Sequence, residues 1–134
     1  MKVIHGDLLE LAEGGHFDVI VHGCNCQCTM GAGIARQIKA RFPEAYDADR
    51  ATEKGDASKL GTCSVAHAQR GDHELTMVNA YTQVHWRGRG KKVDEDAIAR
   101  CFAWVKQEFG GKRIGIPRIG AGLAGGDWDE IRAI

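Results

Sequence analysis

The chain has 134 residues, with 18 Lys and Arg against 18 Asp and Glu, so its formal net charge is zero. This balance argues against nucleic acid as the main partner, and no run approaches the ~20 apolar residues that a membrane span needs. The N-terminus has no signal-peptide core, and five cysteines make an odd number. These features predict a single domain, residues 1–134, in a reducing cytoplasm. The basic stretch at 86–92 has two interpretations, a solvated loop or a local nucleic-acid patch.

The first half of the chain alternates predicted strands and helices. The run at 17–21 is continuously apolar, which is typical of a strand buried on both faces. Ile34, Ile38 and Phe42 recur with helical spacing, and Pro43 ends that helix and opens the next one. The expected elements are a strand at 2–5, a short helical turn that begins at 8–11, a strand at 17–21, a helix over 34–42 and a helix over 44–51.

The second half continues this alternation. Strands at 60–69 and 74–81 form a predicted hairpin, and Asp94 caps a long helix whose apolar face ends at the glycines 110–111. A strand follows at 113–116, and a helix begins at Asp127. The order predicts an α/β layered sandwich with helices on both faces of its sheet. Because the sequence stops inside the last helix, we expect a further C-terminal strand to have been lost by truncation.

Two glycine-rich loops, residues 22–33 and 119–128, each follow an apolar strand. Glycine lets backbone N–H groups approach an anion closely, and a helix N-terminus adds positive potential. Ligands of layered α/β folds bind at the carboxyl ends of strands. The two loops therefore predict a site that holds a diphosphate-containing, nucleotide-like ligand from both sides.

Two more specific interpretations of these loops fail. Gly120, Gly122 and Gly125 match the dinucleotide-binding fingerprint, but that motif needs an acidic residue about 20 positions later, beyond the end of the sequence. The cysteines at 24, 26 and 28 are too closely spaced for a structural zinc site. We expect no metal and no cofactor.

Three side chains near these loops each have a structural and a functional interpretation. His22, at the exit of a buried strand, is either a packed residue or a nucleophile or general acid–base that titrates near neutrality. Asp127 either caps the last helix, with Glu130 three residues later, or takes part in chemistry. Asp7 either caps the first helical turn or accepts a hydrogen bond from an exocyclic amine such as adenine N6.

Taken together, the chain resembles the macrodomain family, whose members bind ADP-ribose. The matching pieces are Gly-Asp-Leu at 6–8, Val-Ile-Val-x-x-x-Asn at 19–25, Gly-Ala-Gly-Ile-Ala at 31–35, and Ile-Pro-x-Ile-Gly-Ala-Gly-Leu at 116–123. They span nearly the whole chain in the family's order. The resemblance implies a three-layer α/β/α sandwich with a mixed sheet.

The resemblance also implies roles for individual residues. Asp7, with Leu8 beside it, would bind the adenine, and Asn25 would contact the distal ribose. The residues that would wrap the diphosphate are Gly31, Ala32, Gly33, Ile34, Gly120, Ala121, Gly122, Leu123 and Ala124. ADP-ribose or a derivative is the expected ligand, no membrane partner is expected, and the chain is expected to be a monomer.

Within the family, His-Gly-Cys-Asn-Cys at 22–26 is most similar to the yeast-type ADP-ribose 1''-phosphate phosphatases, which carry a catalytic histidine in this segment. That similarity makes His22 the catalytic candidate, Asp127 its acidic partner and Asn25 the residue that holds the ribose. A branch that uses a catalytic lysine is disfavoured, because Gln83 and Ala124 replace its lysine and aspartate. The sequence thus predicts an ADP-ribose 1''-phosphate phosphatase. The alternatives are a reader of ADP-ribosylated macromolecules and a hydrolase of ADP-ribosyl or O-acetyl-ADP-ribose esters.

Overall fold

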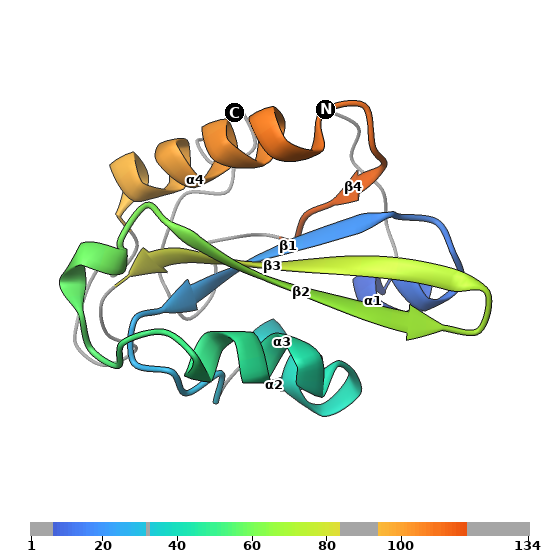
Figure 1. Cartoon of the computed structure of the whole chain (residues 1–134), viewed down its shortest axis with the longest axis horizontal. Helices are drawn as coiled ribbons and strands as arrows, with labels where there is room; N and C mark the ends of the chain where they lie inside the picture. The colour runs from blue at the N-terminus through green and yellow to red at the C-terminus, as the bar shows by residue number, and fades with distance from the viewer. Residues whose placement is uncertain (1–6, 32, 84–93, 118–134) are drawn as a thin grey trace.

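A mixed four-stranded sheet with helices on both faces forms the part of the chain that the computed structural model describes, residues 7–31, 33–83 and 94–117 (Figure 1). This confirms the α/β class and the mixed sheet. The predicted strand at 2–5 and the predicted helix from Asp127 lie outside these ranges. The elements are α1 (Leu8–Glu13), β1 (Val19–Asn25), α2 (Gly33–Arg41), α3 (Pro43–Arg50), the 3-10 turn η1 (Ala57–Lys59), β2 (Cys63–Arg70), β3 (His73–Gln83), α4 (Glu95–Phe109) and β4 (Ile114–Gly115).

The strand order is β2-β3-β1-β4, so β1 lies inside the sheet. β1 runs parallel to both β3 and β4, whereas β2 pairs with β3 as an antiparallel hairpin. In the β1–β3 register Val21 lies opposite Val78, and His22 lies opposite Asn79. The carboxyl ends of β1 and β3 therefore meet at one edge of the sheet, where layered α/β folds place their ligands.

The two faces of the sheet have separate apolar cores. Figure 1 shows α4 above the sheet and α2 with α3 below it. Side chains alternate along β1, so Val19 and Val21 pack against the α4 face while Ile20 and Cys24 pack against the α2 and α3 face. All four are buried. The continuous apolar run in the sequence thus corresponds to a strand covered on both sides.

Helix boundaries follow their predicted signals. Pro43 is the first residue of α3, and the Asp94 carboxylate accepts a hydrogen bond from the Ala97 N–H at 3.0 Å to cap α4. Gly110 follows the last residue of α4, as its predicted stop. No helix in the described ranges is long and apolar enough to cross a bilayer.

Two strands differ from their predicted lengths. β1 extends to Asn25, so residues 22–25, assigned from the sequence to the glycine-rich loop, are strand. Backbone pairing with β3 carries the strand on, with a bulge between Cys24 and Asn25. β4 is shorter than the predicted strand at 113–116. A Cβ on Gly115 would lie 2.8 Å from both the Leu8 Cδ1 and the Phe17 Cδ2 atoms, so glycine allows these side chains to approach the sheet closely.

Candidate functional site

The segment from β1 into α2 has an unusual backbone. Cys28 and Met30 have φ angles of 58° and 43°, and Gly33, the first residue of α2, has a φ of 60°. Left-handed backbone is uncommon for residues other than glycine, and such strain concentrates at binding and catalytic sites. The strained residues follow the carboxyl end of β1, which is where the sequence predicts the first ligand-binding loop.

Asn25 organises this loop through its own side chain. Its Oδ1 accepts a hydrogen bond from the Gln27 N–H at 2.8 Å, and its Nδ2 donates to the Thr29 Oγ1 at 3.1 Å. An amide nitrogen carries two N–H groups, of which Thr29 takes one. The predicted contact of Asn25 with a ribose stays a prediction, and the geometry adds a structural role that the sequence analysis missed.

Residues at the end of α3 and in the segment that follows it make hydrogen bonds to this loop. The Gly55 N–H donates to the Cys26 carbonyl at 2.6 Å, and the Cys28 thiol donates to the Asp49 carbonyl at 3.3 Å. The buried Lys59 ammonium donates to the Thr52 hydroxyl at 2.9 Å and to the Cys28 sulfur at 3.6 Å. The left-handed backbone at Cys28 is therefore fixed by its neighbours.

Nothing in the described part of the chain covers the start of α2. Gly31 and Gly33 are exposed, and a Cβ placed on either would meet no described residue within 4 Å. The first turn of α2 has no acidic residue, and Ile34 beside it is half-buried. Backbone N–H groups at such a helix start suit an anion. The other predicted binding residues, Ala32 and Gly120 to Ala124, and the predicted catalytic Asp127 lie outside the described residues.

His22 is packed inside the molecule. Its side chain is 0% exposed, and its Nε2–H donates to the Asn79 Oδ1 at 2.6 Å. The Cys24 sulfur lies 3.6 Å from the same nitrogen. Burial lowers the pKa of His22 from 6.5 to about 4, although the bond to Asn79 opposes this shift. The ring is therefore neutral at pH 7, and the geometry matches the packed interpretation of His22 and lends the catalytic one no support.

A buried chain of hydrogen bonds continues from His22 beneath the loop. Asn79 Nδ2 donates to the Ala45 carbonyl at 2.9 Å and to the Ser64 hydroxyl at 3.0 Å. The Ser64 hydroxyl lies 2.9 Å from the Tyr81 hydroxyl, which donates to the Asp49 carboxylate at 2.7 Å. Burial raises the pKa of the Asp49 carboxyl and of the Tyr81 phenol. This network connects the sheet to α3.

Sequence reasoning did not single out the β3 members of this group. The available signal was a polar group at alternate positions of a strand, Asn79 and Tyr81, which places both on one face. The register shift between Cys24 and Asn25 interrupts this alternation before Gln83. Gln83 lies opposite Asn25 in the β1–β3 register. Its Oε1 is buried and has no hydrogen-bond partner among the described residues.

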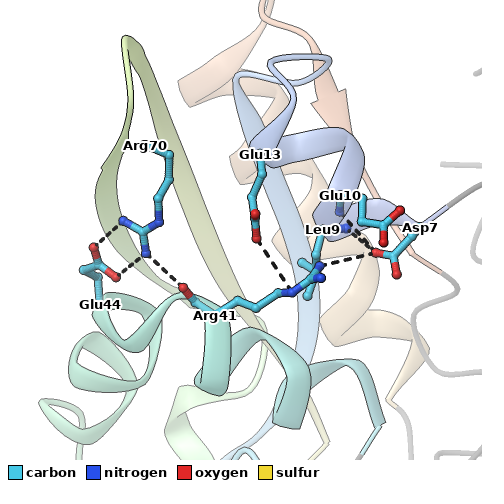
Figure 2. A network of polar contacts seen from close by, with 7 residues as sticks. All are labelled: Asp7, Leu9, Glu10, Glu13, Arg41, Glu44 and Arg70. Carbon is cyan, nitrogen blue, oxygen red and sulfur yellow. Dashed lines mark hydrogen bonds and ion pairs between the residues drawn. The ribbon is translucent and has the colours of Figure 1, made fainter.

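Asp7 caps α1, as one of its two interpretations predicts. Its Oδ1 accepts hydrogen bonds from the Leu9 N–H at 2.9 Å and the Glu10 N–H at 3.2 Å (Figure 2). The Arg41 guanidinium lies 3.8 Å from the same oxygen and 3.7 Å from the Glu13 carboxylate. Leu8, half-buried, packs against the core on the α2 and α3 face. Adenine recognition by Asp7 and Leu8 stays a prediction.

The described part of this region has no cluster of metal ligands. The thiols of Cys24 and Cys26 are buried, and burial raises the pKa of both. In residues 7–31, 33–83 and 94–117, His, Cys, Asp and Glu side chains form no group of three that would hold a metal ion.

These features define an α/β/α domain in which a strained loop leads from the central strand to an open helix N-terminus at the edge of the sheet. The Macro domain family model matches residues 21–134. The chain belongs to the macrodomain family. This confirms the resemblance on which the expected ligand was based.

Several known proteins are similar to this chain. A 17.5 kDa protein from the tk-vs intergenic region of Enterobacteria phage T4 is 40% identical over 100% of this chain and 86% of its own length. The DNA ADP-ribosyl glycohydrolase of Mycobacterium tuberculosis is 31% identical over 94% of this chain, which spans only 35% of that protein. An ADP-ribose 1''-phosphate phosphatase of Ajellomyces capsulatus is 44% identical over 32% of this chain and 16% of its own length.

The fold has matching solved structures. The macrodomain of Mycobacterium tuberculosis DarG superposes with a TM-score of 0.71 at 26% identity, covering 96% of this chain and 82% of that one. The relatives with named activities are hydrolases of ADP-ribose derivatives, and they differ in the group that is attached to ADP-ribose.

Proposed function

We propose that this chain binds ADP-ribose at the carboxyl edge of β1 and β3 and hydrolyses a derivative of it. The observation that carries the proposal is the strained Asn25 loop, which leads to the open backbone of Gly31 and Gly33 at the start of α2. The diphosphate lies against that helix start, and Asn25 faces the distal ribose. Fixing the ligand at both points supplies much of the rate by orientation.

The first substrate is ADP-ribose 1''-phosphate, with ADP-ribosyl esters and ADP-ribosylated DNA as its competitors. The hydrolase names of the relatives support the class of reaction. His22, buried and neutral, acts as a positioning residue that supports the strand end carrying Asn25, and water is the nucleophile. Asp127 is the proposed acidic partner of that water.

The second candidate function is non-catalytic binding of ADP-ribose attached to a macromolecule. One observation favours it: the histidine that the family resemblance makes catalytic is completely covered. A reader needs the same binding loop and no exposed acid or base.

A substrate panel on one preparation tests these candidates. The panel measures ADP-ribose affinity by calorimetry, phosphate release from ADP-ribose 1''-phosphate, cleavage of an ADP-ribosyl ester, and release of ADP-ribose from ADP-ribosylated DNA. We expect ADP-ribose to bind and to raise the melting temperature, because it binds the native state alone. We expect phosphate release to exceed turnover of the other two substrates.

A matched pair of variants connects binding to the α2 start. Gly33 and Gly111 are both left-handed glycines with open space around the missing Cβ. Aspartate tolerates this backbone and adds a negative charge. Gly33→Asp should weaken ADP-ribose binding at least tenfold, whereas Gly111→Asp, at the end of α4, should leave it unchanged. Absence of ADP-ribose binding at millimolar concentration would refute the proposal, and binding without any turnover would favour the reader.

A further inference from the structure

The feature that the proposed function leaves unused is the Gln83 side chain at the carboxyl end of β3. Gln83 lies opposite Asn25, so the two strands bring both carboxamides to the same edge of the sheet. Along β3 the polar groups at alternate positions before it have partners: Asn79 bonds His22, and Tyr81 bonds Asp49. Gln83 follows the register shift beside Asn25, which ends this alternation, and its side-chain oxygen differs from these groups because it has no partner among the described residues.

The Oε1 atom of Gln83 is buried and has no hydrogen-bond partner among the described residues. Buried polar atoms are partnered in the great majority of cases, so each exception calls for an explanation. A carbonyl oxygen accepts hydrogen bonds from O–H or N–H groups and repels anionic phosphate oxygens. The missing partner of Gln83 is therefore a neutral or cationic donor.

No donor among the described residues bonds this oxygen. Asn25, the residue opposite Gln83, donates one of its two Nδ2–H groups to Thr29 and makes no hydrogen bond to Gln83. Asp7, the predicted adenine contact, lies at the Arg41 end of α2, about 12 Å along the helix from Gly33. The adenine amine thus belongs to the far end of the ligand.

We propose that Gln83 is a ligand-binding residue whose Oε1 accepts a hydrogen bond from a hydroxyl of the distal ribose, an inference that rests on the proposed function. The neutral carboxamide binds this hydroxyl and forms no covalent bond with the sugar. Gln83 therefore makes the site specific for ligands that carry a second ribose. ADP, which lacks that ribose, binds without using Gln83.

Calorimetry with ADP-ribose and with ADP tests the inference on the full chain. Gln83→Met keeps the length of the side chain and removes its hydrogen-bonding atoms. We expect the affinity for ADP-ribose to fall at least tenfold and the affinity for ADP to change less than twofold. The melting temperature of the ligand-free variant should stay level or rise, because an unpartnered buried acceptor is replaced by an apolar group.

Two further variants serve as controls. Gln83→Glu keeps an acceptor oxygen at this position and should retain more ADP-ribose affinity than Gln83→Met. Gln69→Met makes the same substitution at an exposed carboxamide near the β2–β3 turn, about 30 Å along the sheet, and should change neither affinity.

The outcomes separate the inference from the proposed function. A parent protein that binds neither ligand refutes both. A parent that binds ADP-ribose while Gln83→Met binds it equally well refutes the inference alone. Equal losses for ADP-ribose and ADP, a lower melting temperature, or a Gln83→Met protein that does not fold would each show that Gln83 is structural, and would overturn the inference.

Discussion

Acidification should destabilise this protein through His22. The pKa of His22 is lowered in the folded state, from 6.5 to about 4, because burial disfavours the charged ring. At a pH between these two pKa values, His22 binds a proton in the unfolded chain and stays neutral in the folded chain. Stability from this residue is therefore complete above pH 6.5 and is lost as the pH falls toward 4.

The size of the loss follows from the two pKa values. One pKa unit is worth about 1.4 kcal/mol. A shift from 6.5 to about 4 therefore limits the loss in the free energy of unfolding to about 3.4 kcal/mol. Integrating the linkage relation from pH 7 gives a loss of about 2 kcal/mol at pH 5 and about 3 kcal/mol at pH 4. A typical domain of this size has a free energy of unfolding of about 5–15 kcal/mol, so the effect is a large fraction of the total.

Urea unfolding of the parent and of His22→Gln isolates this contribution. Glutamine offers an N–H donor to the Asn79 carboxamide and has no proton to gain, whereas every other titrating group is common to both proteins. The difference in the free energy of unfolding should change by about 2 kcal/mol between pH 7 and pH 5, with the parent losing more. The m-values should agree, which shows that both proteins unfold the same amount of surface.

Parallel pH profiles for the two proteins would refute the reasoning. That result would mean that the His22 ring reaches solvent and keeps an ordinary pKa, as a nucleophile or general acid–base requires. The same experiment therefore decides between the packed and the catalytic interpretations of His22, without a substrate.

Two other substitutions test contacts in Figure 2. Arg70 binds Glu44 through two nitrogens at 3.0 and 3.1 Å and donates to the Arg41 carbonyl at 2.9 Å, so Arg70→Ala should lower the free energy of unfolding by about 1 kcal/mol in urea titration. ADP-ribose affinity should not change, and a drop in affinity would show that these Arg70 contacts influence the binding site. Asp7→Ala removes the α1 cap and should lose about 1 kcal/mol, whereas Asp7→Ser keeps a capping oxygen and should lose less. If the carboxylate also binds adenine, both variants should weaken ADP-ribose binding in calorimetry, and full affinity in Asp7→Ser would exclude that role.

The helices were readily predicted from the sequence, because local signals determine their ends. Pro43 begins α3 and the Asp94 carboxylate caps α4, each through contacts within a few residues. The β2–β3 hairpin was predicted for the same reason, since its turn joins adjacent segments. These elements depend on near neighbours, which a single sequence displays.

The end of β1 was not predicted, because distant residues determine it. Residues 22–25 have no strand-like pattern of their own, and their strand conformation comes from pairing with β3, some 57 positions away at the His22–Asn79 bond. The family resemblance placed Asn25 at the ligand edge but gave no sign of its bonds to Gln27 and Thr29. The bond from the buried His22 ring to Asn79 of β3 likewise cannot be read from the neighbours of His22 in sequence.

The buried hydrogen-bond network fixes the relative positions of the strands at this edge of the sheet. Apolar side chains tolerate small shifts along a strand, whereas the His22–Asn79 bond is satisfied in one register only. A slip of β1 against β3 by one residue would leave the buried polar groups of His22 and Asn79 unpaired, each at a cost of about 1–3 kcal/mol. The network thus fixes the carboxyl ends of β1 and β3 relative to one another. Asn25 and Gln83 lie at these ends, so their carboxamides are held in position before a ligand arrives.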